Sequence, residues 1–214
     1  VGPGAAFSSC TFLPGSKLLG HANFTKFQLN QTTLKSGKTT VVAQVGTTSQ
    51  LFVGSSAIEL YDLEMRHASF GCTTPALDIS KSGAKVTCRG CLFHANELSL
   101  KISQEAVVFL ENTVIRDNTA PCSTITVTEA SVLNVRTALF KNNIAYAEGG
   151  ALQILKGSIV NITGSTFDGN LAYVSGGAVS LSESVATFQT TSFTRNRARD
   201  QGAGAVWVSN GHLV

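Results

Sequence analysis

Charged side chains are scarce in this chain. Asp, Glu, Lys and Arg make up 14% of the 214 residues, while hydrophobic residues make up 43%. Exposed faces of helices usually carry Glu and Lys, so this composition speaks against a mainly helical protein. It favours short strands joined by tight turns, and its hydrophobic content argues against a disordered chain.

Long apolar runs and dense basic runs are also missing. No apolar stretch approaches the roughly 18 residues that indicate a transmembrane helix, so we expect no membrane span in this segment. The net charge of +3 is spread thinly, and without a basic patch we do not expect nucleic-acid binding. There is no initiator Met and no signal peptide. We therefore expect a fragment of a longer protein, with targeting signals or anchors outside it.

The cysteines are odd in number: Cys10, Cys72, Cys88, Cys91 and Cys122. At least one of them is therefore free or pairs outside this segment. Three of them, Cys72, Cys88 and Cys91, fall within one repeat length, so we expect a disulfide among them or buried thiols. Cys88-Arg-Gly-Cys91 is a lone C-x-x-C without a second pair or a His partner, which makes zinc binding a weak interpretation. We expect no metal and no cofactor.

What the chain does contain is a repeat of 22–27 residues, clearest from Gly149 to Val208. A large apolar residue anchors each repeat, in the order Phe70, Phe93, Ile115, Phe140, Phe167 and Phe193. Three residues after the last five anchors comes an Asn: Asn96, Asn118, Asn143, Asn170 and Asn196. Asn tolerates the left-handed conformation of a sharp turn, and stacked Asn side chains can hydrogen-bond along a stack. The pattern predicts a structural ladder of Phe and Asn residues.

Between the anchors, apolar residues alternate with polar ones, as in strands that are buried on one face. One strand column carries a residue that is expected to point outward, in the order Asp78, Lys101, Thr126, Gln153, Ser180 and Trp207. A second column has inward pairs at Val86/Cys88, Val108/Leu110, Leu133/Val135, Val160/Ile162 and Ala186/Phe188.

These columns predict a right-handed parallel β-helix with eight or nine rungs of 22–27 residues. The handedness follows from the usual chirality of parallel crossovers. Residues 66–214 are the regular rungs of this single solenoid, and residues 1–65 its irregular N-terminal rungs. Within the latter, 41–45 and 50–53 are predicted strands, while 10–12 and 27–30 look like degenerate Phe-x-x-Asn turns.

The paired motifs resemble a known family. Gly149-Gly150-Ala151 and Gly176-Gly177-Ala178 alternate with Phe140-Lys-Asn-Asn143, Phe167-Asp-Gly-Asn170 and Phe193-Thr-Arg-Asn196. They are similar to the GGA and FxxN repeats of chlamydial polymorphic outer membrane proteins, with related repeats in large surface proteins of algae and other protists. The resemblance covers residues 138–208 best. It implies a right-handed β-helix on the cell surface with a role in adhesion, and it supplies no catalytic residues.

Candidate partner-binding residues are those that break the repeat. Trp207 is predicted to point outward, where an exposed Trp is a usual interface anchor; the alternative is burial against a later segment. Phe109, in the second column, is a weaker candidate of the same kind. Arg195, Arg197 and Arg199 could dock an acidic partner or a sulfated glycan, or could form a solvated turn.

Three N-x-[ST] sequons make Asn23, Asn30 and Asn161 candidates for glycosylation in a secreted eukaryotic protein, and Asn161 is expected to face outward. All three sites could also stay unmodified.

The carboxylates do not form the cluster that a polysaccharide lyase, hydrolase or epimerase needs. Asp78 shares a column with Lys101, which favours a cross-rung ion pair. We therefore expect a non-catalytic, extracellular structural or adhesive segment. Its partners would be other protein chains, the remaining segments of the same protein, or glycans. The alternatives are a building block of a surface filament or membrane-complex ectodomain, and a carbohydrate-active enzyme.

Overall fold

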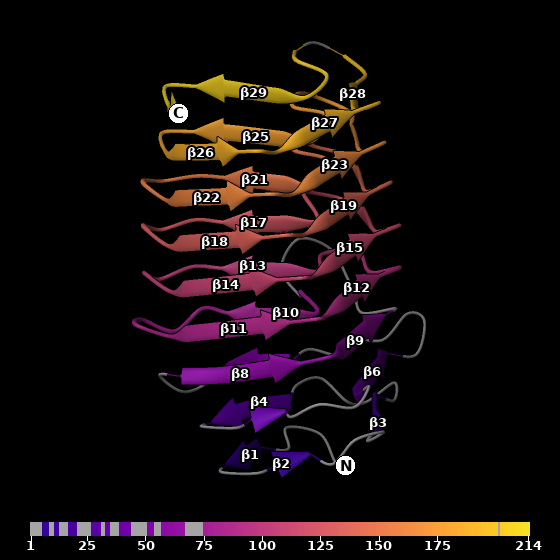
Figure 1. Cartoon of the computed structure of the whole chain (residues 1–214), viewed down its shortest axis with the longest axis vertical. Coiled ribbons are helices and arrows are strands. Elements are labelled where there is room, and N and C mark those ends of the chain that lie inside the picture. The colour runs from indigo at the N-terminus through magenta and orange to yellow at the C-terminus, as the bar shows by residue number, and fades with distance from the viewer. Residues whose placement is uncertain are drawn as a thin grey trace.

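The computed structural model describes residues 58–66, 75–200 and 202–214 in full, and before residue 58 it describes only the backbone of the strands. The described residues contain strands and turns but no helix. The strands stack in columns from β1 at one end to β29 at the other (Figure 1). Every pairing between neighbouring strands is parallel, as in the predicted parallel β-helix.

Three long sheets form the walls of the solenoid, and a short fourth sheet lies between the third and the first. Sheet A contains β1 (Ala6–Ser8), β4 (Phe27–Asn30), β7 (Leu51–Val53), β10 (Leu77–Ile79), β13 (Leu100–Ile102), β17 (Ile125–Val127), β21 (Leu152–Ile154), β25 (Val179–Ser182) and β29 (Val206–Ser209). Sheet B contains β2 (Thr11–Phe12), β5 (Thr33–Leu34), β8 (Ala57–Tyr61), β11 (Lys85–Arg89), β14 (Val107–Glu111), β18 (Val132–Arg136), β22 (Ile159–Thr163), β26 (Val185–Gln189) and β30 (His212–Leu213). Sheet C contains β3 (Lys17–Gly20), β6 (Thr39–Ala43), β9 (Leu63–Arg66), β12 (Leu92–His94), β15 (Val114–Arg116), β19 (Leu139–Lys141), β23 (Thr166–Asp168) and β27 (Ser192–Thr194). Sheet D contains β16 (Thr119–Ala120), β20 (Ile144–Ala145), β24 (Leu171–Ala172) and β28 (Arg197–Ala198).

Six regular rungs run from β10 to β29, and the earlier strands β1, β4 and β7 bring sheet A to nine strands, where eight or nine rungs were predicted for the whole chain. Earlier in the chain, β6 and β7 confirm the predicted strands near 41–45 and 50–53. The interpretation of 27–30 as a turn was wrong: this segment is β4, whose Phe27 pairs with Leu51 in sheet A. A Phe-x-x-Asn spacing alone does not distinguish a turn from a strand.

The predicted strand register is confirmed in sheets A and B. In sheet A, Leu77 and Ile79 pair with Leu100 and Ile102, and the same inward columns continue to Val206 and Val208. These inward residues are buried up to β25, and Val206 and Val208 are partly buried against the same core. Fully burying one such side chain stabilises the fold by about 1.5–3 kcal/mol, so repeated columns account for one continuous core.

The anchor column of sheet C holds a stack of aromatic rings. The centroids of Phe140 and Phe167 lie 4.3 Å apart with the rings 2° from parallel, and those of Phe167 and Phe193 lie 4.9 Å apart. The residue that pairs with Phe93 is Met65, where the repeat had pointed to Phe70. Phe70 itself lies outside the described residues. The correction shows that the rung before Phe93 is longer than the repeat suggested.

The Asn residues of the anchor turns form the predicted ladder. All are buried except Asn196, which is partly buried. Each Asn from Asn118 to Asn170 donates through Nδ2 to the Oδ1 of the Asn in the next rung, over 2.8–2.9 Å. The Nδ2 groups also donate to main-chain carbonyls one rung back, for example from Asn143 to Ile115 at 3.0 Å. This satisfies polar groups that would otherwise be buried unpaired.

The left-handed conformation in these turns belongs to the residue before the Asn, not to the Asn as predicted. Positive φ angles of 52–66° occur at Ala95, Asp117, Asn142, Gly169 and Arg195. The Asn that follows can then turn its amide inward along the stack.

Glycines are needed where rungs approach closely. Gly149 and Gly176 open the two Gly-Gly-Ala turns with φ of 65° and 62°. A Cβ on the second glycine, Gly150, would lie 2.2 Å from the carbonyl oxygen of Gly177 in the next rung. The Gly-Gly-Ala motif is therefore a steric requirement of the stacking.

Candidate functional site

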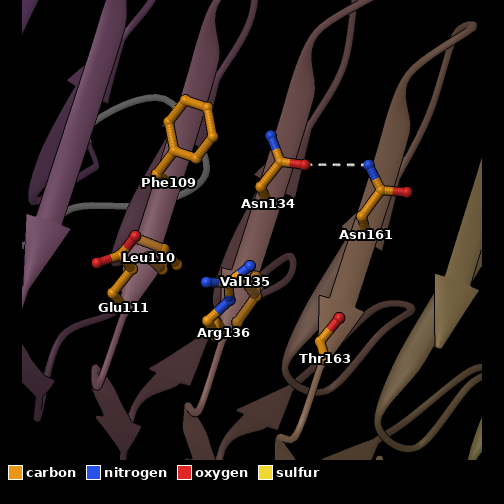
Figure 2. A pocket seen from close by; sticks show the side chains of 8 residues that line it. All are labelled: Phe109, Leu110, Glu111, Asn134, Val135, Arg136, Asn161 and Thr163. Carbon is orange, nitrogen blue, oxygen red and sulfur yellow. Dashed lines mark hydrogen bonds between the residues drawn. The ribbon is translucent and has the colours of Figure 1, made fainter. Parts of the chain in front are cut away.

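The outer face of sheet B carries a groove of about 420 Å³, which we call the sheet B groove (Figure 2). It crosses three neighbouring strands, β14, β18 and β22, and is lined by Phe109, Leu110, Glu111, Asn134, Val135, Arg136, Asn161 and Thr163. Alternation within each strand sends Leu110 and Val135 into the core and leaves their neighbours outside.

The centre of the groove is one column of side chains. Phe109 pairs in register with Asn134, and Asn134 pairs with Asn161. The Nδ2 of Asn161 donates to the Oδ1 of Asn134 at 3.0 Å, as Figure 2 shows. This bond leaves the Nδ2 of Asn134 on the side of Phe109 and the Oδ1 of Asn161 on the opposite side. Within the described residues neither atom has a hydrogen-bond partner, so the column offers one free donor and one free acceptor.

One flank of the groove is charged. Arg89 donates through Nε to Glu111 at 2.7 Å and through a terminal nitrogen to the hydroxyl of Tyr61 at 3.1 Å. Glu111 is the main cause of the raised pKa of Arg89. Arg136 follows Glu111 in the same column, but among the described residues it forms no ion pair. Its guanidinium is thus available on the groove.

The prediction that Phe109 points outward is confirmed, because its side chain is partly exposed on the outer face of sheet B. The ammonium group of Lys85 lies 5.4 Å from the centre of its ring. A cation at this distance is attracted by the ring electrons. Phe109 is therefore held in place while part of it stays open to the groove.

A second exposed surface lies where sheet D turns into sheet A. We call Tyr146, Tyr173 and Arg199 the aromatic corner. They stack one above another, since each N–H donates to a carbonyl in the rung before. The Tyr146 and Tyr173 rings lie 4.8 Å apart, and the guanidinium of Arg199 lies 4.3 Å from the Tyr173 ring. Tyr146 is 54% exposed. The sequence interpretation missed both tyrosines, although each directly follows an Ala of the repeat.

Trp207 points outward as predicted, pairing with Ser180 on the outer face of sheet A. It is 40% exposed. Part of the indole is covered because it lies close to Gly202, where an added Cβ would come within 3.3 Å of its ring. Trp207 thus combines a fixed position with open apolar surface.

The three arginines of the last anchor turn do not form one site. Arg195 binds Asp168 with both ends of its guanidinium, including an Nε bond of 2.9 Å. This pair, together with the hydroxyl of Thr194, lowers the pKa of Asp168. Arg197 is exposed on β28, while Arg199 stacks on Tyr173. The three arginines that were predicted to bind an acidic partner together therefore lie in three different environments.

Cys88, Cys91 and Cys122 are free thiols, so the expected disulfide is not present between Cys88 and Cys91. Cys72 lies outside the described residues. Cys88 and Cys91 are buried, and the interaction with Cys91, followed by burial, raises the pKa of Cys88. Buried thiols had been the other expectation. Among residues 58–66, 75–200 and 202–214, no group of three or more His, Cys, Asp or Glu could hold a metal ion.

Of the three sequons, only Asn161 is described with its side chain. It is exposed on β22, as predicted. Asn23 lies outside the described residues, and Asn30 is described only by its backbone in β4.

A His–Glu pair was not foreseen. The Nε2 of His94 lies 2.9 Å from a carboxylate oxygen of Glu64, one rung earlier on sheet C. The strand register pairs His94 with Arg66 and Leu92 with Glu64, so His94 and Glu64 are diagonal neighbours on adjacent strands. Knowing this register would have revealed the pair. Asp78 and Lys101 are confirmed as column neighbours, but the predicted ion pair between them is not among the ion pairs of the described residues. Ser80 donates instead to the carboxylate of Asp78.

No model of a protein family matches this chain, and neither does a characterised protein or a solved structure. In the part of the chain that the structure describes, no helix is long and apolar enough to cross a membrane.

Proposed function

We propose that this chain is a non-catalytic β-solenoid segment of an extracellular surface protein that holds partner molecules on its outer faces. The aromatic corner is the observation that carries the proposal. Two tyrosines, one above the other with their rings tilted by 51°, and an arginine on a turn between sheets form a rigid, exposed set of the residue types that dominate protein interfaces. Trp207, on the neighbouring sheet A face, adds a further exposed aromatic side chain.

The construction of the rod supports the same role. The buried Asn ladder and the Phe stack fix each rung against the next, so the outer side chains keep their positions without a ligand. Binding then costs little ordering of the protein. The similarity of the Gly-Gly-Ala and Phe-x-x-Asn repeats to those of chlamydial polymorphic outer membrane proteins, whose passenger regions are implicated in adhesion, points in the same direction.

The test places a photo-activated cross-linking amino acid at Tyr146 of the full-length protein, in the cells that produce it. Cross-linking on intact cells is expected to give a discrete adduct with one partner. Lys156, exposed at the opposite turn of the same region, is the matched control position and should give none. Equal adducts at both positions, or no adduct at Tyr146, would contradict the proposal.

Location is tested separately. An amine-reactive biotin reagent that cannot cross membranes should label Lys156 on intact cells. Labelling only after lysis would contradict an extracellular position. Turnover of a polysaccharide by the purified full-length protein would instead favour the alternative of a carbohydrate-active enzyme.

A further inference from the structure

The sheet B groove has the chemistry of a carbohydrate site. A sugar ring has apolar C–H faces and a rim of hydroxyls that both donate and accept hydrogen bonds. The groove offers a matching set: the ring of Phe109, the free donor of Asn134 and the free acceptor of Asn161. Aromatic surface with a few placed polar groups is typical of small-molecule sites.

The groove also has a direction. Phe109, Asn134 and Asn161 lie on three successive strands in one register column, so their spacing follows the strand separation of roughly 4.8 Å. A ligand that contacts all three must lie across the strands, along the axis of the solenoid. An extended oligosaccharide can place successive rings over successive strands.

Charge selects the class of saccharide. The groove contains one carboxylate, Glu111, and one guanidinium without an ion-pair partner among the described residues, Arg136. Glu111 is already paired with Arg89, so the charge left open in the groove is the positive charge of Arg136, which would attract the sulfates or carboxylates of an acidic glycan. A planar guanidinium can bind a carboxylate or a sulfate through two parallel N–H donors. These features favour an acidic oligosaccharide over a neutral one.

We propose that the sheet B groove is a binding site for an acidic oligosaccharide laid along the solenoid axis. The proposal rests on the proposed function, since it names one ligand class for a rod that holds partners. Phe109 stacks on one ring, while Asn134 and Asn161 bind hydroxyls of the same ring and of the next.

The test uses the full-length protein produced in bacteria, which leaves Asn161 unmodified. The probes, followed by isothermal titration, are acidic oligosaccharides of heparin and polygalacturonate, with the neutral hexasaccharides of chitin, cellulose, xylan and starch as counterparts. At least one acidic probe should bind more tightly than every neutral one. Phe109→Ala and Asn134→Ala should each raise its Kd by about tenfold, the size expected for removing a central contact.

Gln153→Ala is the matched control, because Gln153 is an outward residue of sheet A at the same height as β22. It should leave Kd unchanged, and circular dichroism should show that all variants keep the fold. The site is overturned if no acidic probe binds, if neutral probes bind as tightly as acidic ones, or if the groove variants bind like the parent. Cross-linking at Tyr146 separates the two proposals. If the Tyr146 adduct forms but no oligosaccharide binds, only the proposal for the groove is rejected. If an oligosaccharide binds but no Tyr146 adduct forms, only the proposal for the aromatic corner is rejected.

Discussion

The side-chain nitrogen of Asn143 donates to the side-chain oxygen of Asn170 at 2.9 Å, although 27 positions separate the two residues in the chain. The same relationship links Asn118 to Asn143 and Asn170 to Asn196. Asn118, Asn143 and Asn170 are buried, and the amide of each bonds to two rungs at once. The ladder is therefore the element that ties local turns to the stacking of the whole rod.

Replacing one member of the ladder should be costly. Asn143→Ala removes the side-chain partner of the Ile115 carbonyl and of the main-chain N–H of Asn118, while the Oδ1 of Asn170 still accepts from the main-chain N–H of residue 143. Each unsatisfied buried group costs about 1–3 kcal/mol, so we expect a loss of about 2 kcal/mol or more in the free energy of unfolding. Chemical denaturation measures it. Asn142→Gly is the control, because Asn142 holds a left-handed position where the next rung has Gly169, and it should change stability little. Equal effects of the two variants would contradict the role of the ladder.

The aromatic stack should depend on packing more than on ring chemistry. Phe167 is fully buried between Phe140 and Phe193, so Phe167→Ala should cost about 3–5 kcal/mol through the cavity that it leaves. Phe167→Leu should cost clearly less, since Ile115 occupies the same column two rungs earlier. Thermal unfolding followed by circular dichroism compares the two variants. A leucine variant as unstable as the alanine variant would show that the ring stack itself is required.

Gly150 should not accept even the smallest side chain. A Cβ there would lie 2.2 Å from the carbonyl oxygen of Gly177. That oxygen belongs to the main chain of the neighbouring rung, so it can move away only if the main chain of that rung shifts. We expect Gly150→Ala to unfold the local rungs, seen as fast amide hydrogen exchange in β21 and β25. Gly157→Ala is the control: it meets no atom within 4 Å, and Ala130 holds a similar φ of 55°. Its cost should be about 1–2 kcal/mol, and a similar cost at Gly150 would refute the steric argument.

The Asp168–Arg195 pair should give the stability a pH dependence. Arg195 lowers the folded-state pKa of Asp168. The ionised Asp168 therefore stabilises the fold at pH values above the pKa of the unfolded chain. That stabilisation is lost as the pH falls through the folded-state pKa. Arg195→Gln should therefore destabilise the protein at neutral pH. The difference from the parent should shrink below roughly pH 4, near the ordinary pKa of Asp. Urea denaturation at several pH values measures this. Arg197→Gln, at an exposed position on the next strand, should show no such dependence, and a parallel shift in both variants would argue against the pair.

Asn161 lies in the sheet B groove and heads a sequon, so modification and ligand binding should compete. Secretion from a eukaryotic host is expected to add a glycan at Asn161, visible by mass spectrometry of the peptide that contains it. The modified protein should then lose binding of free acidic oligosaccharide, because the attached sugar fills the groove. An unmodified Asn161, or undiminished binding by the modified protein, would contradict this expectation.

Much of the fold could be predicted because each rung repeats the chemistry of the last. Alternating apolar residues identify the inward face of a strand, and a fixed spacing aligns Leu77 with Val206 across six rungs. The outward position of Trp207 followed from the same alignment. Where the repeat is irregular this reasoning failed, as at Phe27 and at Met65, because a single spacing has no neighbouring rungs to confirm it.

The candidate sites were less predictable. Phe109 and Asn161 were each singled out, but their meeting across Asn134 was not foreseen, and neither was the stacking of Arg199 on Tyr173. The sequence by itself determined the period, the inward columns and the polar ladder, because burial and alternation act within each strand. Only the tertiary structure decided that Glu111 pairs with Arg89, that Arg136 has no ion pair among the described residues, and that Arg195 pairs with Asp168. Those choices depend on lateral contacts between side chains a full rung apart, where several partners of suitable charge are within reach and packing selects one.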